Sequence, residues 1–277
     1  MATELPGFTP ATADGAAGLA ALMDSPRLAL IALDFDGTLS PIVSDPDHAR
    51  PLPQAIEALR ALAPLVGTIA VITGRPARFA VQYGSLDQVP DIIVLGQYGR
   101  QHWQHGQLSA PPPPPGLARA RERLPVVLAE AKAPVGTWIE DKTDALAVHT
   151  RRTADPAATL AQITQPLLRL AAETGLRGEP GRMVMELRPD GADKGKTLKD
   201  LAANKPGAAV MFAGDDLGDR PAFAAVRELR PAGHPGLAVL SQSAEVPELA
   251  AEVDLIVDGP AGIAAFLTAL ATALAGR

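Results

Sequence analysis

The sequence lacks several features that define whole classes of protein. None of its 277 residues is cysteine, which excludes disulfide bonds and thiolate metal sites. No apolar stretch reaches the roughly 20 residues that a membrane span needs. The longest uncharged segment, residues 261–276, is shorter and rich in alanine, and we expect a helix packed on the core there. No basic cluster reverses the formal net charge of −6, so a general nucleic-acid binder is not expected.

The composition that remains is that of an ordinary globular protein. Hydrophobic residues make up 47% and charged residues 20% of the chain. The length allows one large domain or two moderate ones. The N-terminal residues lack the basic and apolar regions of a secretory signal, so we expect a cytoplasmic protein without a membrane partner. Whether the first 25 residues, rich in alanine and glycine, belong to a domain is left open.

Short apolar runs alternate with segments of helical spacing. A helix is predicted over 52–63, and another begins at Asp193. Buried strands are predicted within residues 28–35, 67–75, 91–99, 208–216, 237–241 and 253–258. This alternation predicts a parallel α/β sheet, in which ligands bind at the carboxyl ends of strands. Asp34, Thr73 and Gly96 all fall at such ends.

A proline-rich segment interrupts this pattern. Ala110–Gly116 is expected to lie outside helices and sheets, because proline lacks the amide donor that both need. We interpret it as a stiff loop that crosses between domains, and a docking peptide is the less favoured alternative. Beyond it we predict a helix from Asp155-Pro156 to Gly175 and a strand at 181–189 that is exposed on one face. The predicted domains are therefore a core of 1–110 and 188–277 and an inserted α+β domain of 111–187.

Two groups of carboxylates follow predicted strands. Asp34 and Asp36 follow the first, and Asp215, Asp216 and Asp219 follow the strand near residue 210. If the first strand extends far enough, Asp34 and Asp36 share one face, and a cation between them or a bound proton must offset their repulsion. Carboxylates gathered at two strand ends suit Mg²⁺. A helix start at Asp219 is the alternative explanation for the second group, and its spacing does not fit an EF-hand.

Two further residues suit a phosphate ligand. Thr73 can hydrogen-bond a phosphoryl oxygen, and Lys194 supplies positive charge at a helix start. The segment around Lys194 also resembles the nucleotide-binding loop G-x-x-x-x-G-K-[ST]. Only three residues separate Gly191 from Gly195, one too few, so a nucleotide site is disfavoured. A solvated helix lysine would be the ordinary interpretation if Lys194 stood alone.

These residues together resemble a known superfamily. The segments DFDGT, TGR, DKG and GDDLGD, in this order, resemble the four motifs of haloacid-dehalogenase (HAD) phosphatases. LDFDGTLSPI, IEDKTDALAVHTRR and MELRPDGADKG resemble more closely the trehalose-6-phosphate phosphatase family. The resemblance implies a Rossmann-like HAD core with an inserted α+β cap domain, Mg²⁺ as cofactor and trehalose 6-phosphate as small-molecule substrate. The chain departs from the family at Tyr98, where many relatives have histidine.

The resemblance also implies roles for individual residues. Asp34 would attack phosphorus, and Asp36 would act as general acid and then general base. Thr73 and Lys194 would hold the phosphoryl oxygens. Mg²⁺ would be bound by Asp34, Asp215 and the backbone carbonyl of Asp36, with Asp216 and Asp219 positioning its waters. Sugar and phosphate contacts from the cap would come from Glu140, Lys142, Arg151, Arg182 and Glu186.

Two alternatives stay open. The first is a HAD phosphatase for another sugar phosphate, such as a phosphate of sucrose or mannosylglycerate. The second is a catalytically silent domain that binds a sugar phosphate, although the intact set of Asp34, Asp36, Lys194 and Asp215 argues against it. A monomer is favoured.

Overall fold

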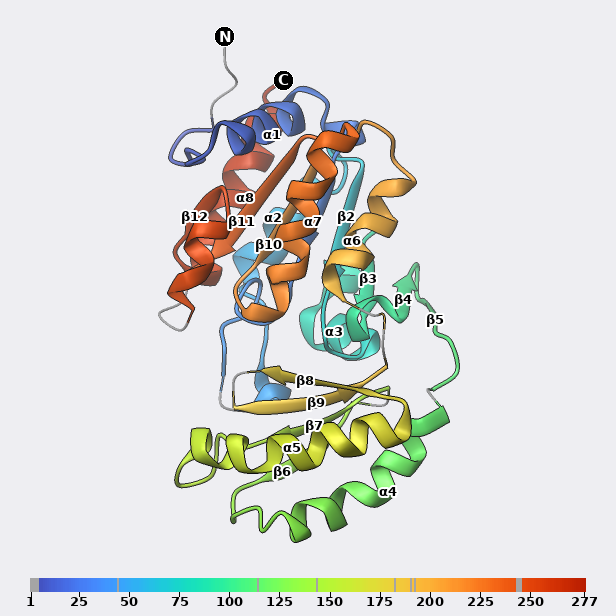
Figure 1. Cartoon of the computed structure of the whole chain (residues 1–277). Coiled ribbons are helices and arrows are strands. Elements are labelled where there is room, and N and C mark those ends of the chain that lie inside the picture. The colour runs from blue at the N-terminus through green and yellow to red at the C-terminus, as the bar shows by residue number, and fades with distance from the viewer. Residues whose placement is uncertain are drawn as a thin grey trace. The chain divides into compact units, whose positions relative to one another are not determined.

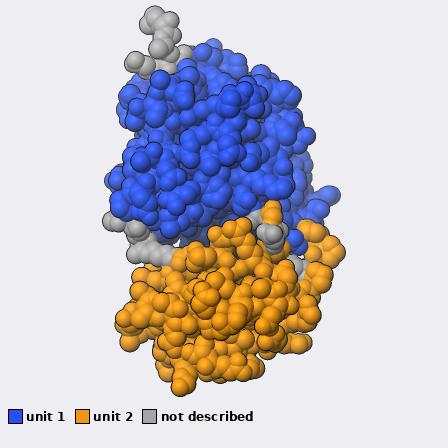
Figure 2. Space-filling model, viewed as in Figure 1, with its two compact units in different colours: residues 1–110, 193–277 blue, residues 111–192 orange. Residues whose placement is uncertain are grey.

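The computed structural model describes residues 5–43, 45–113, 115–142, 144–181, 183–189, 191, 193–242 and 246–277. The chain divides into two compact units, each with its own core (Figure 2). Unit 1 comprises Met1–Ala110 and Asp193–Arg277, and unit 2 comprises Pro111–Ala192. The structure therefore groups residues 188–192 with the inserted segment, whereas the sequence interpretation ended that segment at residue 187.

Unit 1 is built on an eight-stranded sheet in the order β12-β11-β10-β1-β2-β3-β4-β5 (Figure 1). The strands from β12 to β3 pair in parallel and lie within the predicted apolar runs, except that β11 begins one residue earlier, at Gly236, while β4 and β5 extend the edge as an antiparallel hairpin. The strands are β1 (Leu30–Leu33), β2 (Thr68–Ile72), β3 (Ile93–Gly96), β4 (Gln101–Gln104), β5 (Gln107–Ser109), β10 (Val210–Gly214), β11 (Gly236–Ser241) and β12 (Leu255–Val257).

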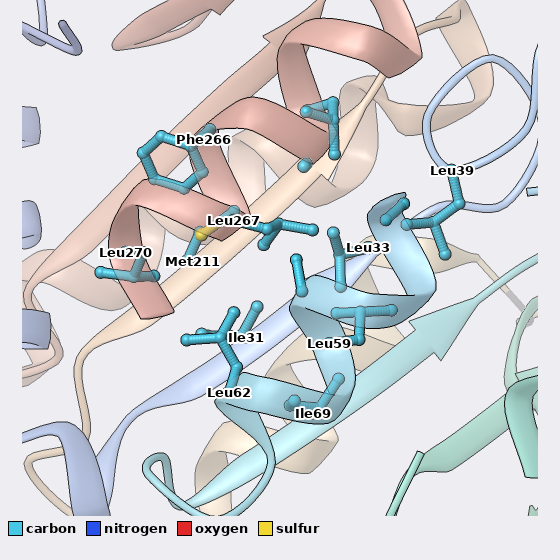
Figure 3. Close-up of a cluster of buried hydrophobic side chains, with 14 of the residues drawn as sticks. Ile31, Leu33, Leu39, Leu59, Leu62, Ile69, Met211, Phe266, Leu267 and Leu270 are labelled. Carbon is cyan, nitrogen blue, oxygen red and sulfur yellow. The ribbon is translucent and has the colours of Figure 1, made fainter. Parts of the chain in front are cut away.

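Helices cover both faces of this sheet. Because successive strand residues point to opposite sides, Ile31 and Leu33 pack into one apolar cluster while Leu30 and Ala32 pack into another. Figure 3 shows Ile31 and Leu33 in the first cluster. That cluster includes residues of α1 (Ala13–Asp24), α2 (Pro53–Leu62), α3 (Ala77–Gly84) and α8 (Gly259–Ala275); the second includes residues of α6 (Lys194–Ala203) and α7 (Arg220–Leu229). The central parallel strands β11, β10, β1 and β2 are therefore buried on both sides, as expected for a parallel sheet.

The two ends of the chain contribute to this core. Helix α1 places Leu19 and Leu22 in the first cluster, so this part of the N-terminal segment belongs to unit 1. Helix α8 is the expected C-terminal helix and buries Phe266, Leu267 and Leu270. No helix among the described residues is both long and apolar enough to cross a membrane.

Unit 2 packs two helices on a four-stranded antiparallel sheet of order β6-β7-β9-β8. Its strands are β6 (Trp138–Asp141), β7 (Leu146–His149), β8 (Arg177–Gly181) and β9 (Val184–Arg188), and its helices are α4 (Pro115–Glu130) and α5 (Pro156–Thr174). Helix α5 has Asp155 as N-cap and left-handed Gly175 as C-cap, as predicted. The expectation that the proline-rich segment stays outside helices is wrong for its end, because α4 begins at Pro115. A proline fits the first helical turn, where its missing N–H has no partner.

The prediction that β9 is exposed on one face is also wrong. Met185 and Leu187 pack into the apolar cluster under α4 and α5, but Glu186 and Arg188 on the opposite face are buried too. Glu186 forms an ion pair with Lys142, and Arg188 lies 3.3 Å from Glu179. Charged side chains tolerate burial when they are paired, which the polar-apolar alternation of the sequence does not show.

Candidate active site

Asp34 is the first residue after β1 and continues the side of the strand that faces α6. The residue is 5% exposed, and one carboxylate oxygen lies 2.7 Å from the ammonium nitrogen of Lys194. Lys194 is the first residue of α6, whose N-cap is Asp193, and it is 4% exposed. The fold thus brings together the predicted acid of one strand end and the predicted lysine of a helix start.

Asp219 organises the second group of acids. One of its oxygens lies 2.7 Å from Lys194 Nζ, and the other accepts the backbone N–H groups of Asp215 at 2.9 Å and Asp216 at 3.1 Å. The Asp216 carboxylate caps the short helix η5 (Leu217–Asp219) by accepting the N–H of Gly218. Helix α7 begins at Arg220, directly after Asp219, so the interpretation of Asp219 as a helix start is confirmed, and it coexists with the gathering of carboxylates.

Three of the predicted acids lie close enough to share one cation. One oxygen each from Asp34, Asp215 and Asp219 lies within 4.8 Å of the other two, and all three residues are buried. Several carboxylates at one lysine leave excess negative charge, and an all-oxygen donor set suits Mg²⁺. The residues present therefore fit this ion. The side chains of Asp36 and Asp216 are engaged elsewhere, with Arg75 and with the η5 cap.

Burial and mutual repulsion raise the pKa values of these acids. Burial raises the pKa of Asp34 well above its usual range, although the charge of Lys194 opposes the shift. Burial, with the charges of Asp219 and Asp34, raises the pKa of Asp215 to about 10. Burial and Asp219 raise the pKa of Asp216 to about 6. Burial lowers the pKa of Lys194, but Asp219 and Asp34 outweigh it and the net pKa is raised. Burial without a divalent cation therefore favours the protonated forms of these acids, and such a cation would compete with those protons.

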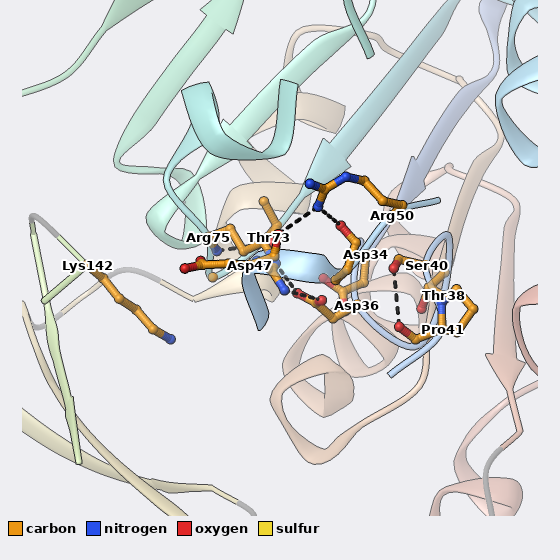
Figure 4. A network of polar contacts seen from close by, with 12 residues as sticks. Asp34, Asp36, Thr38, Ser40, Pro41, Asp47, Arg50, Thr73, Arg75 and Lys142 are labelled. Atoms are coloured by element: carbon orange, nitrogen blue, oxygen red, sulfur yellow. Dashed lines mark hydrogen bonds and ion pairs between the residues drawn. The ribbon is translucent and has the colours of Figure 1, made fainter. Parts of the chain in front are cut away.

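Asp36 lies apart from this lysine. Strand β1 ends at Leu33 and its pairing with β10 extends only to the Asp34 N–H, which donates to the Ala213 carbonyl at 2.8 Å, so strand alternation does not align Asp36 with Asp34. Arg75 Nε and Nη2 each lie 2.6 Å from an oxygen of Asp36 (Figure 4). Each acid of the pair thus has its own cation, which resolves the repulsion between them. Arg75 was not singled out from the sequence, which required only a cation or a bound proton near Asp34 and Asp36 without identifying its source.

The turn that carries these acids is tightly packed. Gly37 has φ +72°, and a Cβ atom there would lie 1.9 Å from an oxygen of Asp215, so no other residue fits without displacing that carboxylate. Thr38 Oγ1 donates to Asp215 at 3.4 Å, and Ser241 Oγ at the end of β11 donates to the Gly37 carbonyl at 2.6 Å. Thr73 follows β2 and is 1% exposed. These contacts hold the turn against two neighbouring strands.

Two of the candidate sugar-binding residues of unit 2, Glu140 and Glu186, lie on the sheet face opposite α4 and α5. Glu140 of β6 and Glu186 of β9 stand in one row across the sheet, and Lys142 pairs with Glu186. His149 Nε2 lies 2.8 Å from Glu140. Burial raises the pKa of Glu140, but the hydrogen bond to His149 and the charge of Lys142 together lower it by more, so the net shift of this pKa is downward. Arg151 is exposed beyond β7, and Arg182 lies outside the described residues.

The sequence matches the protein-family profile described as trehalose-phosphatase over residues 32–259. The chain belongs to this family. It is 34% identical to the trehalose-phosphate phosphatase of Mycobacterium avium over 288 residues, which covers 98% of the chain and 68% of that protein. It is also 37% identical over 214 residues to an uncharacterized glycosyl hydrolase of Mycobacterium tuberculosis, covering 73% of the chain and 15% of that protein. The chain therefore spans about two thirds of the length of the Mycobacterium avium protein and about a seventh of the length of the Mycobacterium tuberculosis protein.

Solved structures share the fold of this family member at low sequence identity. The C-terminal domain of Candida albicans trehalose-6-phosphate phosphatase superposes with a TM-score of 0.75 at 21% identity, covering 96% of the chain and 99% of that domain. A haloacid dehalogenase-like hydrolase from Bacteroides thetaiotaomicron gives 0.56 at 15% identity, covering 86% and 98%. The predicted family and the predicted HAD fold, a mainly parallel sheet with an inserted α+β module, are confirmed.

Proposed function

We propose that the chain hydrolyses trehalose 6-phosphate to trehalose and inorganic phosphate. The observation that carries this proposal is the buried group of Asp34, Lys194 and Asp215 at the carboxyl edge of the sheet, in a member of the trehalose-phosphatase family. The group combines a nucleophile with a cation that can neutralise phosphoryl oxygens. The Mycobacterium avium relative is named for this substrate class.

The proposed reaction has two steps. Asp34 attacks phosphorus, the bond from phosphorus to the sugar oxygen breaks, and Asp36 gives its proton to that oxygen. Water then attacks the aspartyl-phosphate and returns a proton to Asp36, which releases phosphate and regenerates Asp34. Thr73 and Lys194 hold the phosphoryl oxygens. Arg75 pairs with the Asp36 carboxylate and thereby fixes its orientation two residues from the nucleophile Asp34.

Mg²⁺ is the proposed cofactor. Asp34, Asp215 and the backbone carbonyl of Asp36 would hold it, and Asp216 and Asp219 would position its waters. When bound, the ion would neutralise charge on the phosphoryl oxygens. The engagement of both Asp219 oxygens with Lys194 and backbone N–H groups supports an orienting role for that residue.

We propose unit 2 as the cap that recognises the sugar. The polar face that carries Glu140, Lys142 and Glu186 offers hydrogen-bond acceptors and a cation for a polyhydroxylated leaving group. Arg151 and Arg182 are proposed to contribute further contacts. Recognition by a cap would also restrict access of bulk water to the phosphoryl group.

Phosphate release from trehalose 6-phosphate, glucose 6-phosphate and sucrose 6-phosphate, each with and without Mg²⁺, tests the proposal. Asp34→Asn serves as the inactive variant. Asp200→Asn, which changes an exposed aspartate paired with Lys196 on the same helix as Lys194, serves as the matched control. We expect Mg²⁺-dependent release from the first ester, lost in Asp34→Asn and retained in Asp200→Asn. Release from another ester alone would overturn the substrate but keep the chemistry. No release from any ester by folded protein would favour a binding domain.

A further inference from the structure

The turn after β3 has an unusual backbone. Gln97 and Tyr98, in the short helix η4 (Gln97–Gly99), have φ values of 50° and 57°, so two successive residues other than glycine are left-handed. Side chains disfavour this conformation, and it persists only where surrounding contacts hold it. Gln97 is only 2% exposed. The conformation of the turn is therefore maintained by its contacts, which are with the Thr73–Arg75 loop and with helix α6.

On one side, the turn holds the loop that follows β2. The backbone N–H of Tyr98 donates to the Thr73 carbonyl at 2.9 Å, and the backbone N–H of Gln97 donates to the Arg75 carbonyl at 2.9 Å. The side-chain amide of Gln97 donates to the Gly74 carbonyl at 3.1 Å. Three successive carbonyls of the Thr73–Arg75 loop thus accept hydrogen bonds from two residues of one turn.

On its other side, the turn contacts the helix that carries Lys194. Thr197 Oγ1, one helical turn beyond Lys194, donates to the Tyr98 carbonyl at 2.8 Å. Gly99 lies so close to this hydroxyl that a Cβ atom on the glycine would be 2.2 Å from it. The 2.8 Å hydrogen bond, with no room for a Cβ atom at Gly99, leaves α6 little freedom to move relative to the turn.

We propose that Gln97 and Tyr98 form a positioning brace that fixes the distance between Thr73 and Lys194 and so shapes the phosphoryl-binding site. This inference rests on the proposed phosphatase function, in which these two residues hold the phosphoryl oxygens. The brace acts through the main chain of Gln97 and Tyr98, the side-chain amide of Gln97 and the hydroxyl of Thr197, and none of these groups needs to touch substrate. The left-handed conformation of Gln97 and Tyr98 is retained because it lets this turn contact both the loop after β2 and helix α6, which are far apart along the chain.

Thr197→Val tests the brace, because valine matches threonine in shape and removes the hydroxyl. We expect kcat/KM for trehalose 6-phosphate to fall about ten-fold and the inhibition constant of inorganic phosphate to rise by a similar factor. The inhibition constant of trehalose, which lacks the phosphoryl group, should stay within two-fold of wild type. Thr164→Val is the matched control: this half-buried helical threonine on α5 donates to the Leu160 carbonyl, and its loss should leave all three constants unchanged.

A second pair of variants probes the backbone. Tyr98→Val introduces a branched side chain that resists the left-handed conformation, whereas Tyr98→Asn introduces one that tolerates it at similar size. The valine variant should weaken phosphate inhibition at least five-fold more than the asparagine variant. Equal effects of the two, an unchanged phosphate constant in Thr197→Val, or a parallel loss of trehalose affinity would each overturn the brace.

The two proposals fail separately. If wild-type protein releases no phosphate from trehalose 6-phosphate, the proposed substrate is wrong. Binding of inorganic phosphate with Mg²⁺ present, followed by thermal shift on the same variants, then tests the brace without turnover. The same loss of phosphate affinity in Thr197→Val supports the brace, and wild-type affinity in that variant overturns it.

Discussion

Addition of Mg²⁺ should stabilise unit 1 strongly, because the acid cluster is costly to bury without a divalent cation. Asp34, Asp215 and Asp219 are all buried, and the pKa of Asp215 is raised to about 10 by burial and by the neighbouring carboxylates. A ligand at about 100 times its dissociation constant stabilises the folded state by about 2.7 kcal/mol. Unit 1 comprises about 195 residues, whose unfolding entropy is roughly 0.4 kcal/mol/K. The expected increase in Tm is therefore about 7 °C.

The size of this shift should depend on pH in a defined direction. The pKa of Asp215 is near 3.8 in the unfolded chain and about 10 in the folded one. Between these values the metal-free folded state holds a proton that the unfolded state has released, so its stability falls as pH rises. Mg²⁺ displaces this proton when it binds, so the stability of the Mg²⁺-bound protein does not fall with pH for this reason. The Tm increase at a fixed Mg²⁺ concentration should be larger at pH 8.5 than at pH 6.

Differential scanning calorimetry on wild type, Asp215→Asn and Asp200→Asn measures this effect. Asp215→Asn removes the titrating carboxyl, so without Mg²⁺ it should unfold above the wild-type temperature, by a margin that grows with pH, and it should lose most of the shift with Mg²⁺. Asp200→Asn, exposed on α6, should keep the full shift. A shift that survives Asp215→Asn, or that shrinks as pH rises, would refute the assignment of the ion to this cluster.

Three further substitutions have definite expected outcomes. Asp36→Asn should lower kcat by at least about 100-fold with little change in Tm, measured by phosphate release at saturating substrate, and a loss under ten-fold would exclude general acid–base catalysis there. Glu186→Gln removes the carboxylate that pairs with the partly buried Lys142; KM should rise more than ten-fold while kcat changes less, and the reverse split would contradict sugar binding. Gly37→Ala should abolish the Mg²⁺-dependent Tm shift, because its Cβ would displace Asp215, and a normal shift would show that the turn can relax.

Local sequence patterns were sufficient to predict most of the fold. The parallel strands of unit 1 are short apolar runs because both sheet faces are covered, and this signal needs no knowledge of distant residues. Helix α5 could be bounded from its own cap residues, Asp155 and Gly175. The β4–β5 hairpin was missed, although its turn at His105-Gly106, with φ values of 49° and 78°, has the residue types that such turns favour.

The sequence was sufficient to predict which residues lie in the candidate site, but not which residues they pair with. Asp34, Thr73, Lys194 and Asp215 were found because strand ends and helix starts can be read locally. The ion pairs of Asp36 with Arg75 and of Glu186 with Lys142 depend on how separate segments meet, so no local pattern contains them. The left-handed pair at Gln97 and Tyr98 is similar: neither residue type favours that conformation, and contacts with Thr73 and Thr197 impose it.

The insertion of unit 2 has a consequence for synthesis on the ribosome. Strand β1 pairs with β10 through Leu30 and Val210, on opposite sides of the inserted segment. At about 5–20 residues per second, the second strand follows the first after roughly 10–40 s. During that interval one apolar edge of β1 lacks its partner and is open to pairing with other chains. Unit 2, whose residues are contiguous, can complete its own core first. Aggregation of the nascent chain should therefore depend on how quickly residues 193–214 are translated.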